Sequence, residues 1–141
     1  MSGARHRILY DADCGFCRWT LGWLLRWDRR RRLEPVALQD PEAARLLAGM
    51  AEERRMASWH LVDSQGEVTS AGAATAPLLR LLPGGWLPAR AAAALADAVD
   101  RAYRWTADHR SVLGTLVTEG ARRRADRLIA SRAARGPNGL A

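Results

Sequence analysis

Cys14 and Cys17 are the only two cysteines in this chain of 141 residues, and they lie three positions apart. On a helix, residues at this spacing share a face, so the two sulfurs can close into a small disulfide ring and reopen. The N-terminus of a helix stabilises negative charge and therefore favours the thiolate form of a cysteine placed there. The Cys-x-x-Cys pair thus indicates a dithiol redox site.

Two other interpretations of the cysteine pair stay open. Free cysteines are among the most buried residue types, so both thiols could be inert residues of the core. The pair could also be half of a zinc site, with the other ligands drawn from His6, His60 and His109. Because these histidines are scattered singly and form no second paired motif, we expect neither a bound metal nor a cofactor.

The residues around the pair predict a strand, a turn and a long helix. The strand is expected over Arg7–Tyr10, the turn over Asp11–Asp13, and the helix over Cys14–Asp28, with Asp11 or Asp13 as its N-cap. The pair then lies just beyond the carboxyl end of the first strand. Sheets of α/β proteins place their functional sites at such ends.

The rest of the chain alternates strands with helices and then becomes wholly helical. The expected elements are a strand over 33–38, in which Pro35 indicates an edge strand or an irregular start, a helix over 41–55 capped by Asp40, a hairpin of strands over 58–62 and 67–70, and helices over 72–82, 88–108 and 111–128. This order predicts an α/β fold: a thioredoxin-like four-stranded mixed sheet flanked by helices, with a C-terminal helical extension.

The predicted organisation is a single domain in three stretches. Residues 1–86 are expected to form the core that carries the Cys-x-x-Cys motif, and 87–135 to be the helical extension packed on it. Residues 136–141 are expected to be a disordered tail. Because residues beyond 121 are predicted to lie outside the α/β core, we expect them to be dispensable for redox chemistry.

Apart from three histidines, every basic residue is an arginine, and the formal net charge is +7. It clusters at Arg29–Arg32 and over 122–135, where six arginines accompany a single acid, Asp126. Each cluster is typical of a solvated helix end or face. Each could instead bind an anionic partner, such as nucleic acid or acidic lipid.

Trp19, Trp23 and Trp27 recur at helical spacing on the helix that carries the cysteines. We interpret this row as part of the core, with an exposed docking surface for a partner as the alternative.

No secretory signal or transmembrane segment is evident, since the apolar run over 19–25 is far shorter than the ~20 residues that span a bilayer. A cytoplasmic, reducing location is therefore expected. There, a lone Cys pair is more often catalytic or metal-binding than structural.

The stretch from Asp11 to Cys17 resembles the Asp-x-x-Cys-x-x-Cys signature of the DCC-type family of thiol-disulfide oxidoreductases. Weaker matches to the family pattern follow at 26–30, Leu38-Gln39, Val62-Asp63, 103–105 and His109-Arg110. The resemblance implies a thioredoxin-like fold and thiol–disulfide exchange, with Asp11 and both cysteines as the residues that carry over. It implies no particular substrate. Thioredoxins proper have a cis-proline before the third strand, but Met56-Ala57-Ser58 contains no proline, so their mode of peptide binding does not carry over.

In the expected reaction, Cys14 is the attacking thiolate and Cys17 resolves the mixed disulfide from one turn further into the helix. Gly15 would give the ring conformational freedom, and Phe16 would cover one side of it. Asp11 stays open between a turn former and a proton-handling group.

Three further residues are expected to flank this site: Asp13, Ser58 and Trp59. The expected partner is a disulfide- or thiol-bearing protein or small-molecule substrate, with an anionic partner at the arginine clusters as a further possibility. The alternative function is an arginine-rich binding or adaptor module on the same fold, whose cysteines do not cycle.

Overall fold

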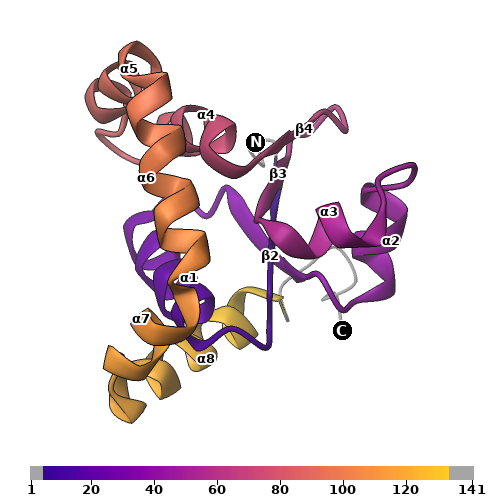
Figure 1. Cartoon of the computed structure of the whole chain (residues 1–141), viewed down its shortest axis with the longest axis vertical. Coiled ribbons are helices and arrows are strands. Elements are labelled where there is room, and N and C mark those ends of the chain that lie inside the picture. The colour runs from indigo at the N-terminus through magenta and orange to yellow at the C-terminus, as the bar shows by residue number, and fades with distance from the viewer. Residues whose placement is uncertain (1–4, 134–141) are drawn as a thin grey trace.

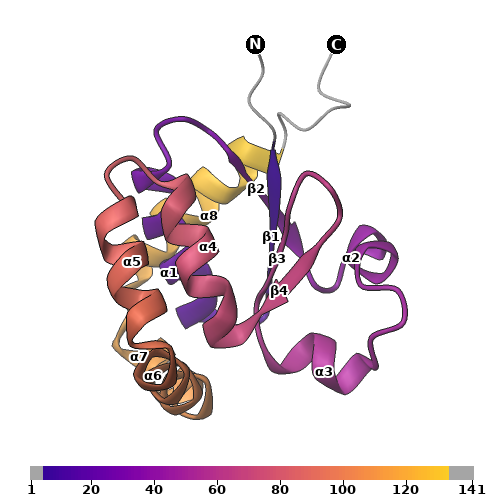
Figure 2. The ribbon, with the colours of Figure 1, turned by 90° about the horizontal axis from the view of Figure 1, so that it is seen from above.

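Four strands form one mixed sheet in the order β2–β1–β3–β4, with helices on both faces (Figures 1 and 2). The computed structural model describes residues 5–133. β2 runs parallel to β1, whereas β3 runs antiparallel to both β1 and β4. The strands are β1 His6–Tyr10, β2 Leu33–Ala37, β3 His60–Val62 and β4 Val68–Ser70. The predicted α/β sheet is confirmed, and Pro35 lies on an edge strand as expected.

Helices occupy the two faces of the sheet unequally. They are α1 Gly15–Trp27, α2 Pro41–Leu46, α3 Glu52–Ala57, the 3-10 turn η1 Ala71–Ala74, α4 Thr75–Leu81, α5 Trp86–Ala94, α6 Ala96–Asp108, α7 Arg110–Leu116 and α8 Glu119–Ala133. Figure 2 shows α2 and α3 on one side of the sheet and the larger group, with α1 and α8, on the other. None of the helices within residues 5–133 has the length and apolar character needed to cross a membrane.

β1 is the central strand, and it separates two hydrophobic cores. Successive side chains of a strand point to opposite faces, so Ile8 and Leu9 enter different cores, and both are buried. Ile8 packs with residues of α1, α4 and α8, whereas Leu9 packs with residues of α2 and β2. Burial of β1 on both faces holds its carboxyl end, and the turn that follows it, in a fixed place.

The helix predicted over 41–55 is two helices, α2 and α3. Asp40 caps α2 as expected, since its Oδ1 accepts from the Glu42 N–H at 3.1 Å. α2 ends at Leu46, and the turn after it includes Gly49, whose φ of +89° is a conformation that other residues rarely adopt. That glycine was the sequence signal for the break.

The two helices predicted over 88–108 and 111–128 are also divided. The first breaks at Leu95, between α5 and α6, with no proline or glycine to mark the place. The second breaks between α7 and α8, where Thr118 Oγ1 accepts from the Ala121 N–H at 3.2 Å. Threonine is a common N-cap, so only this second break had a local signal.

α8, which belongs to the predicted helical extension, packs along α1 (Figure 1). A Cβ added to Gly22 would come within 2.7 Å of the Ala125 Cβ. Gly22 therefore permits the close approach of the two helices. Ile129 of α8 is buried in the same core as Ile8.

An ion pair in the interior fixes the end of α8. Arg132 Nη1 donates to Asp28 Oδ2 at 2.9 Å, and its Nη2 donates to the backbone carbonyls of Leu25 and Asp28 at 2.8 Å. The Asp28 side chain is fully buried and the Arg132 side chain is 10% exposed. Asp28 also accepts from the N–H groups of Arg32 and Leu33, so its carboxylate is well satisfied.

The tryptophan row on α1 is not in the core. Trp23 is 58% exposed and Trp27 is 40% exposed, so the core interpretation is wrong for these two residues. The opposite side of α1, with Leu21 and Leu25, takes the core contacts instead. The Trp23 ring lies 5.5 Å from the guanidinium of Arg26, which a cation–π contact explains.

Candidate functional site

Cys14 is itself the N-cap of α1, in the place that was predicted for Asp11 or Asp13. Its Sγ accepts a hydrogen bond from the backbone N–H of Cys17 at 3.2 Å. This contact satisfies one of the backbone N–H groups that the first turn of a helix leaves without a partner. Both cysteines are free thiols.

Cys17 lies one turn further into α1, and its environment favours the neutral thiol. Burial raises the pKa of the Cys17 thiol to about 12, with contributions from the contact with the Cys14 sulfur, the charge of Cys14 and the charge of Asp11. Arg110 acts in the opposite direction. The two sulfurs, three residues apart, therefore have unlike surroundings.

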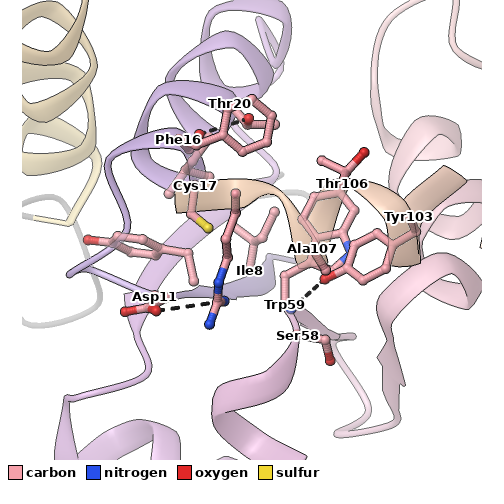
Figure 3. Close-up of a pocket in the computed structure, with 13 residues that line it drawn as sticks. Ile8, Asp11, Phe16, Cys17, Thr20, Ser58, Trp59, Tyr103, Thr106 and Ala107 are labelled. Atoms are coloured by element: carbon pink, nitrogen blue, oxygen red, sulfur yellow. Dashed lines mark hydrogen bonds and ion pairs between the residues drawn. The ribbon is translucent and has the colours of Figure 1, made fainter. Parts of the chain in front are cut away.

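Cys17 borders an apolar pocket with a volume of about 200 Å³. We call it the apolar pocket; its walls include Ile8, Phe16, Ser58, Trp59 and Tyr103. Figure 3 shows the Cys17 sulfur turned into this space near Ile8, with the rings of Trp59 and Tyr103 on the far side.

Tyr103 of α6 closes the apolar pocket against β3. Its hydroxyl accepts from the Trp59 backbone N–H at 3.0 Å, and the two rings stack with their centroids 6.0 Å apart (Figure 3). Burial raises the pKa of Tyr103, which keeps the phenol neutral. The backbone donor of Trp59, at the start of β3, is therefore already used within the chain.

The turn before α1 is held by Gln39, which follows β2. Its Nε2 donates to Asp11 Oδ1 at 2.8 Å and to Asp13 Oδ2 at 3.2 Å, and its Oε1 accepts from the Ala12 N–H at 3.2 Å. Asp11 Oδ1 also accepts from the Asp13 N–H at 3.0 Å. Asp11 Oδ2 lies 3.8 Å from Arg110 Nη1. Asp11 and Asp13 therefore stabilise the turn, and neither caps the helix.

Cys14 borders a second pocket, with a volume of about 390 Å³. We call it the polar pocket; its walls include Asp11, Asp13, Gly15, Arg18, Arg110 and Arg122. Three helices contribute to it, because Arg18 comes from α1, Arg110 from α7 and Arg122 from α8. Asp11 is the only carboxylate that borders both pockets among the residues described.

All eight residues that the sequence singled out lie at these pockets. Asp11, Phe16, Cys17, Ser58 and Trp59 border the apolar pocket, and Asp11, Asp13, Cys14 and Gly15 border the polar pocket.

Sequence reasoning did not identify Gln39, Tyr103, Arg110 and Arg122 as site residues. The first three fall within the weaker matches to the DCC-type pattern, which was the available signal. Arg122 belongs to the C-terminal arginine cluster and had no signal that separated it from its neighbours.

The arginines over 122–135 do not act as one surface. Arg122 enters the polar pocket and Arg132 is buried against Asp28, whereas Arg123 pairs with Glu119 on the exposed side of α8. Arg135, like the predicted disordered tail at 136–141, lies outside the described residues. Arg29, Arg30 and Arg31 are exposed, as expected for a solvated helix end.

Two of the three histidines of the alternative zinc site, His60 and His109, make contacts elsewhere in the chain. His60 is buried in β3, where its Nε2 lies 2.9 Å from the Arg55 carbonyl and its Nδ1 lies 2.6 Å from Ser70 Oγ. Burial lowers the pKa of His60. His109 stacks on Trp105 with the ring centroids 4.5 Å apart. Within residues 5–133, no group of three or more His, Cys, Asp or Glu side chains is placed to hold a metal ion.

Comparison with known proteins gives one match. The family model of the DCC1-like thiol-disulfide oxidoreductases matches residues 8–115, which begin in β1 and end in α7. No curated protein and no solved structure matches the chain. The mixed sheet and the position of the Cys pair agree with a thioredoxin-like fold. Because the family match spans most of the chain and includes both cysteines, the chain belongs to the DCC1-like thiol-disulfide oxidoreductase family.

Proposed function

We propose that this protein is a thiol-disulfide oxidoreductase that cycles between the Cys14–Cys17 dithiol and the corresponding disulfide. One observation carries the proposal: the N–H of Cys17 donates to the Cys14 sulfur, while burial keeps Cys17 a neutral thiol. The thiolate is the nucleophile in thiol–disulfide exchange, so this contrast supports Cys14 as the attacking cysteine and Cys17 as the resolving one.

In the first step, the Cys14 thiolate attacks one sulfur of a substrate disulfide. A bond forms between Cys14 and that sulfur, the substrate S–S bond breaks, and the other substrate sulfur leaves as a thiolate. The half-exposed position of Cys14 at the polar pocket gives the substrate access. Gly15, which follows Cys14, leaves that approach free of a side chain.

In the second step, Cys17 loses its proton and attacks the Cys14 sulfur. The Cys14–Cys17 disulfide forms and the second substrate thiolate leaves, so the substrate gains two electrons and the cysteine pair loses them. We assign the acceptor of the Cys17 proton to Asp11, because its carboxylate borders the apolar pocket into which Cys17 points. Its Oδ2 lies 3.8 Å from Arg110 Nη1, beyond ordinary hydrogen-bond distance.

Phe16, Ser58 and Trp59 keep water from Cys17 by forming the walls of the apolar pocket. Low exposure to water raises the pKa of a thiol, so these walls hold Cys17 protonated until the mixed disulfide has formed. This arrangement prevents both cysteines from competing for the substrate.

Oxidation of the reduced protein tests the proposal. Mild oxidant should remove two hydrogens from the mass of the chain, and a reductant should restore them. Titration against glutathione redox buffers should give a potential of about −200 to −270 mV, the range of cycling oxidoreductases. Two thiols that stay free under oxidant, or a stoichiometrically bound zinc ion, would contradict it.

A further inference from the structure

Arg122 differs from the other two arginines of the polar pocket, Arg18 and Arg110, in its ion pairing within residues 5–133. Arg18 pairs with Asp126 at 3.3 Å, and Arg110 lies 3.8 Å from Asp11. Arg122 forms no ion pair with a carboxylate of the described part of the chain. Its Nη2 donates to the Gly114 carbonyl, and its Nε is buried without a hydrogen-bond partner.

The guanidinium of Arg122 lies against the start of α1. A Cβ added to Gly15 would be 3.5 Å from the Arg122 Nε, which places this cation beside the residue that follows Cys14. The guanidinium borders the polar pocket and pairs with no carboxylate of the described residues, so an incoming carboxylate would supply the missing counter-charge. A guanidinium suits a carboxylate in particular, because its planar donors can form two parallel hydrogen bonds with the two oxygens.

We propose that Arg122 binds a carboxylate of the substrate, and that the substrate class is a small disulfide carrying carboxylates near its sulfurs. This inference rests on the proposed exchange at Cys14. The Cys14 thiolate attacks the substrate sulfur nearer the bound carboxylate, the substrate S–S bond breaks, and the other half leaves as a carboxylate-bearing thiolate. Cys17 then releases the bound half and takes over the bond to Cys14.

Two features favour a small molecule over an extended peptide. β3 has a strand on each side, so an extended peptide has no free edge to pair with there, and the N–H of Trp59, just before β3, already donates to the Tyr103 hydroxyl. The polar pocket, at about 390 Å³, has the size of a small-molecule site.

Arg122 also lies outside residues 8–115, the stretch that the family model matches. Selectivity for a carboxylate would therefore come from α8, an element that follows the matched region. The reaction and the choice of substrate are then provided by different parts of the chain.

Alkylation of Cys14 in the full chain tests the carboxylate site without requiring redox activity. Iodoacetate and iodoacetamide are nearly the same size, but only iodoacetate carries a carboxylate. A free thiolate reacts more slowly with the anionic reagent because like charges repel. In this protein we expect iodoacetate to label Cys14 faster than iodoacetamide does. Peptide mass spectrometry near neutral pH measures both labelling rates.

Two variants separate Arg122 from the general positive charge of the protein. Arg122→Gln should lower the iodoacetate-to-iodoacetamide rate ratio at Cys14 about tenfold, the effect of losing a charge-assisted hydrogen bond. Arg127→Gln removes the same charge from the exposed side of α8 and should leave the ratio unchanged. The rate ratio of the wild-type protein is itself a test, so the inference can still be overturned if the Arg122 variant folds poorly.

A wild-type ratio equal to that of free cysteine overturns the inference. So does an equal loss of the ratio in both variants, because the preference would then reflect net charge.

Three disulfides of similar shape test the substrate class: dithiodipropionate, hydroxyethyl disulfide and cystamine, which are anionic, neutral and cationic. The inference predicts that rates fall in that order, and equal rates or the reverse order overturn it. Failure of the neutral disulfide to oxidise Cys14 and Cys17 would instead overturn the proposed function, independently of the alkylation ratio.

Discussion

The polar pocket beside Cys14 and the apolar pocket beside Cys17 differ in almost every physical property, although one helical turn separates the two sulfurs. Arginines and carboxylates form the first, and aromatic and aliphatic side chains form most of the second. The Cys14 sulfur accepts a hydrogen bond from a backbone N–H, whereas the Cys17 thiol is partly buried among apolar side chains. A symmetric Cys-x-x-Cys motif thus acquires asymmetric chemistry from the elements packed against it.

Replacing each of the two cysteines in turn by serine should have the largest effect. At pH 7 a thiol with the pKa of Cys17, about 12, has on the order of one thiolate in 10⁵ molecules. Cys17→Ser should therefore retain attack and accumulate a mixed disulfide through Cys14. Cys14→Ser should react at least about 100-fold more slowly with a neutral disulfide. Intact mass spectrometry measures both, and trapping through Cys17 would reverse our assignment.

The next largest effect should be the change in the alkylation rate of Cys17 with pH. Its alkylation rate should rise about tenfold per pH unit from about pH 8 and level off only near pH 12, since the thiolate is the reactive form. Labelling by iodoacetamide, read by peptide mapping, measures this. A plateau of the Cys17 rate near pH 9 would mean that the apolar pocket admits water.

The raised pKa of Cys17 also makes the free energy of unfolding depend on pH. The pKa of Cys17 is raised from 9.0 to about 12, so the unfolded chain releases this proton first as pH rises. The contribution of Cys17 to stability is therefore complete below pH 9 and is lost as pH rises through 12. Urea unfolding of the reduced protein should show an alkaline loss that is smaller in Cys17→Ala.

Detaching α8 should change the polar pocket while leaving the apolar pocket walls in place. Arg132→Gln leaves Asp28 buried without its cationic partner, and breaking such a pair costs about 3–5 kcal/mol. Urea unfolding should show this loss, with Arg127→Gln as an exposed control on the same helix. Under conditions in which the variant stays folded, the iodoacetate preference at Cys14 should fall as it does in Arg122→Gln. An unchanged preference would mean that α8 does not need this anchor to place Arg122.

The different origins of the two pockets explain how much the sequence could predict. The apolar pocket is formed by residues close to the motif and to β3, and Phe16, Ser58 and Trp59, which the sequence predicted to flank the site, line it together with Cys17. The order of strands and helices along the chain also predicted the mixed sheet, and Pro35 lies on its edge strand β2. These features depend on local preferences that one stretch of sequence records.

Long-range packing accounts for what the sequence could not predict. The break at Leu95 has no local signal, yet it lets α6 bring Tyr103 to the apolar pocket. The placement of α8 depends on Gly22 meeting Ala125 and on Arg132 meeting Asp28, contacts between residues about a hundred positions apart. Short-range periodicity cannot detect either contact, and so Arg122 looked like any other arginine of its cluster.

The smallest expected effect concerns Asp11, which borders both pockets. Asp11→Asn keeps an oxygen for the Asp13 N–H and for Gln39, so the turn should survive, while the negative charge is lost. That loss has two opposite consequences for Cys17. Its pKa should fall, because the Asp11 charge contributes to raising it. The proposed acceptor of its proton is also gone. We expect the second to dominate, so that release of a preformed mixed disulfide from Cys14 slows by about tenfold.

Two measurements on the same variant separate these consequences. Alkylation of Cys17 against pH reports its acidity, and single-turnover release of the mixed disulfide reports the resolving step. Asp13→Asn is the matched control, because Asp13 is an exposed carboxylate that also binds Gln39 and borders only the polar pocket. If release speeds up in Asp11→Asn in proportion to the new acidity of Cys17, the proton goes to solvent and Asp11 only forms the turn. If release slows while Cys17 becomes more acidic, acidity alone cannot explain the rate, and Asp11 carries the proton between the two environments that it borders.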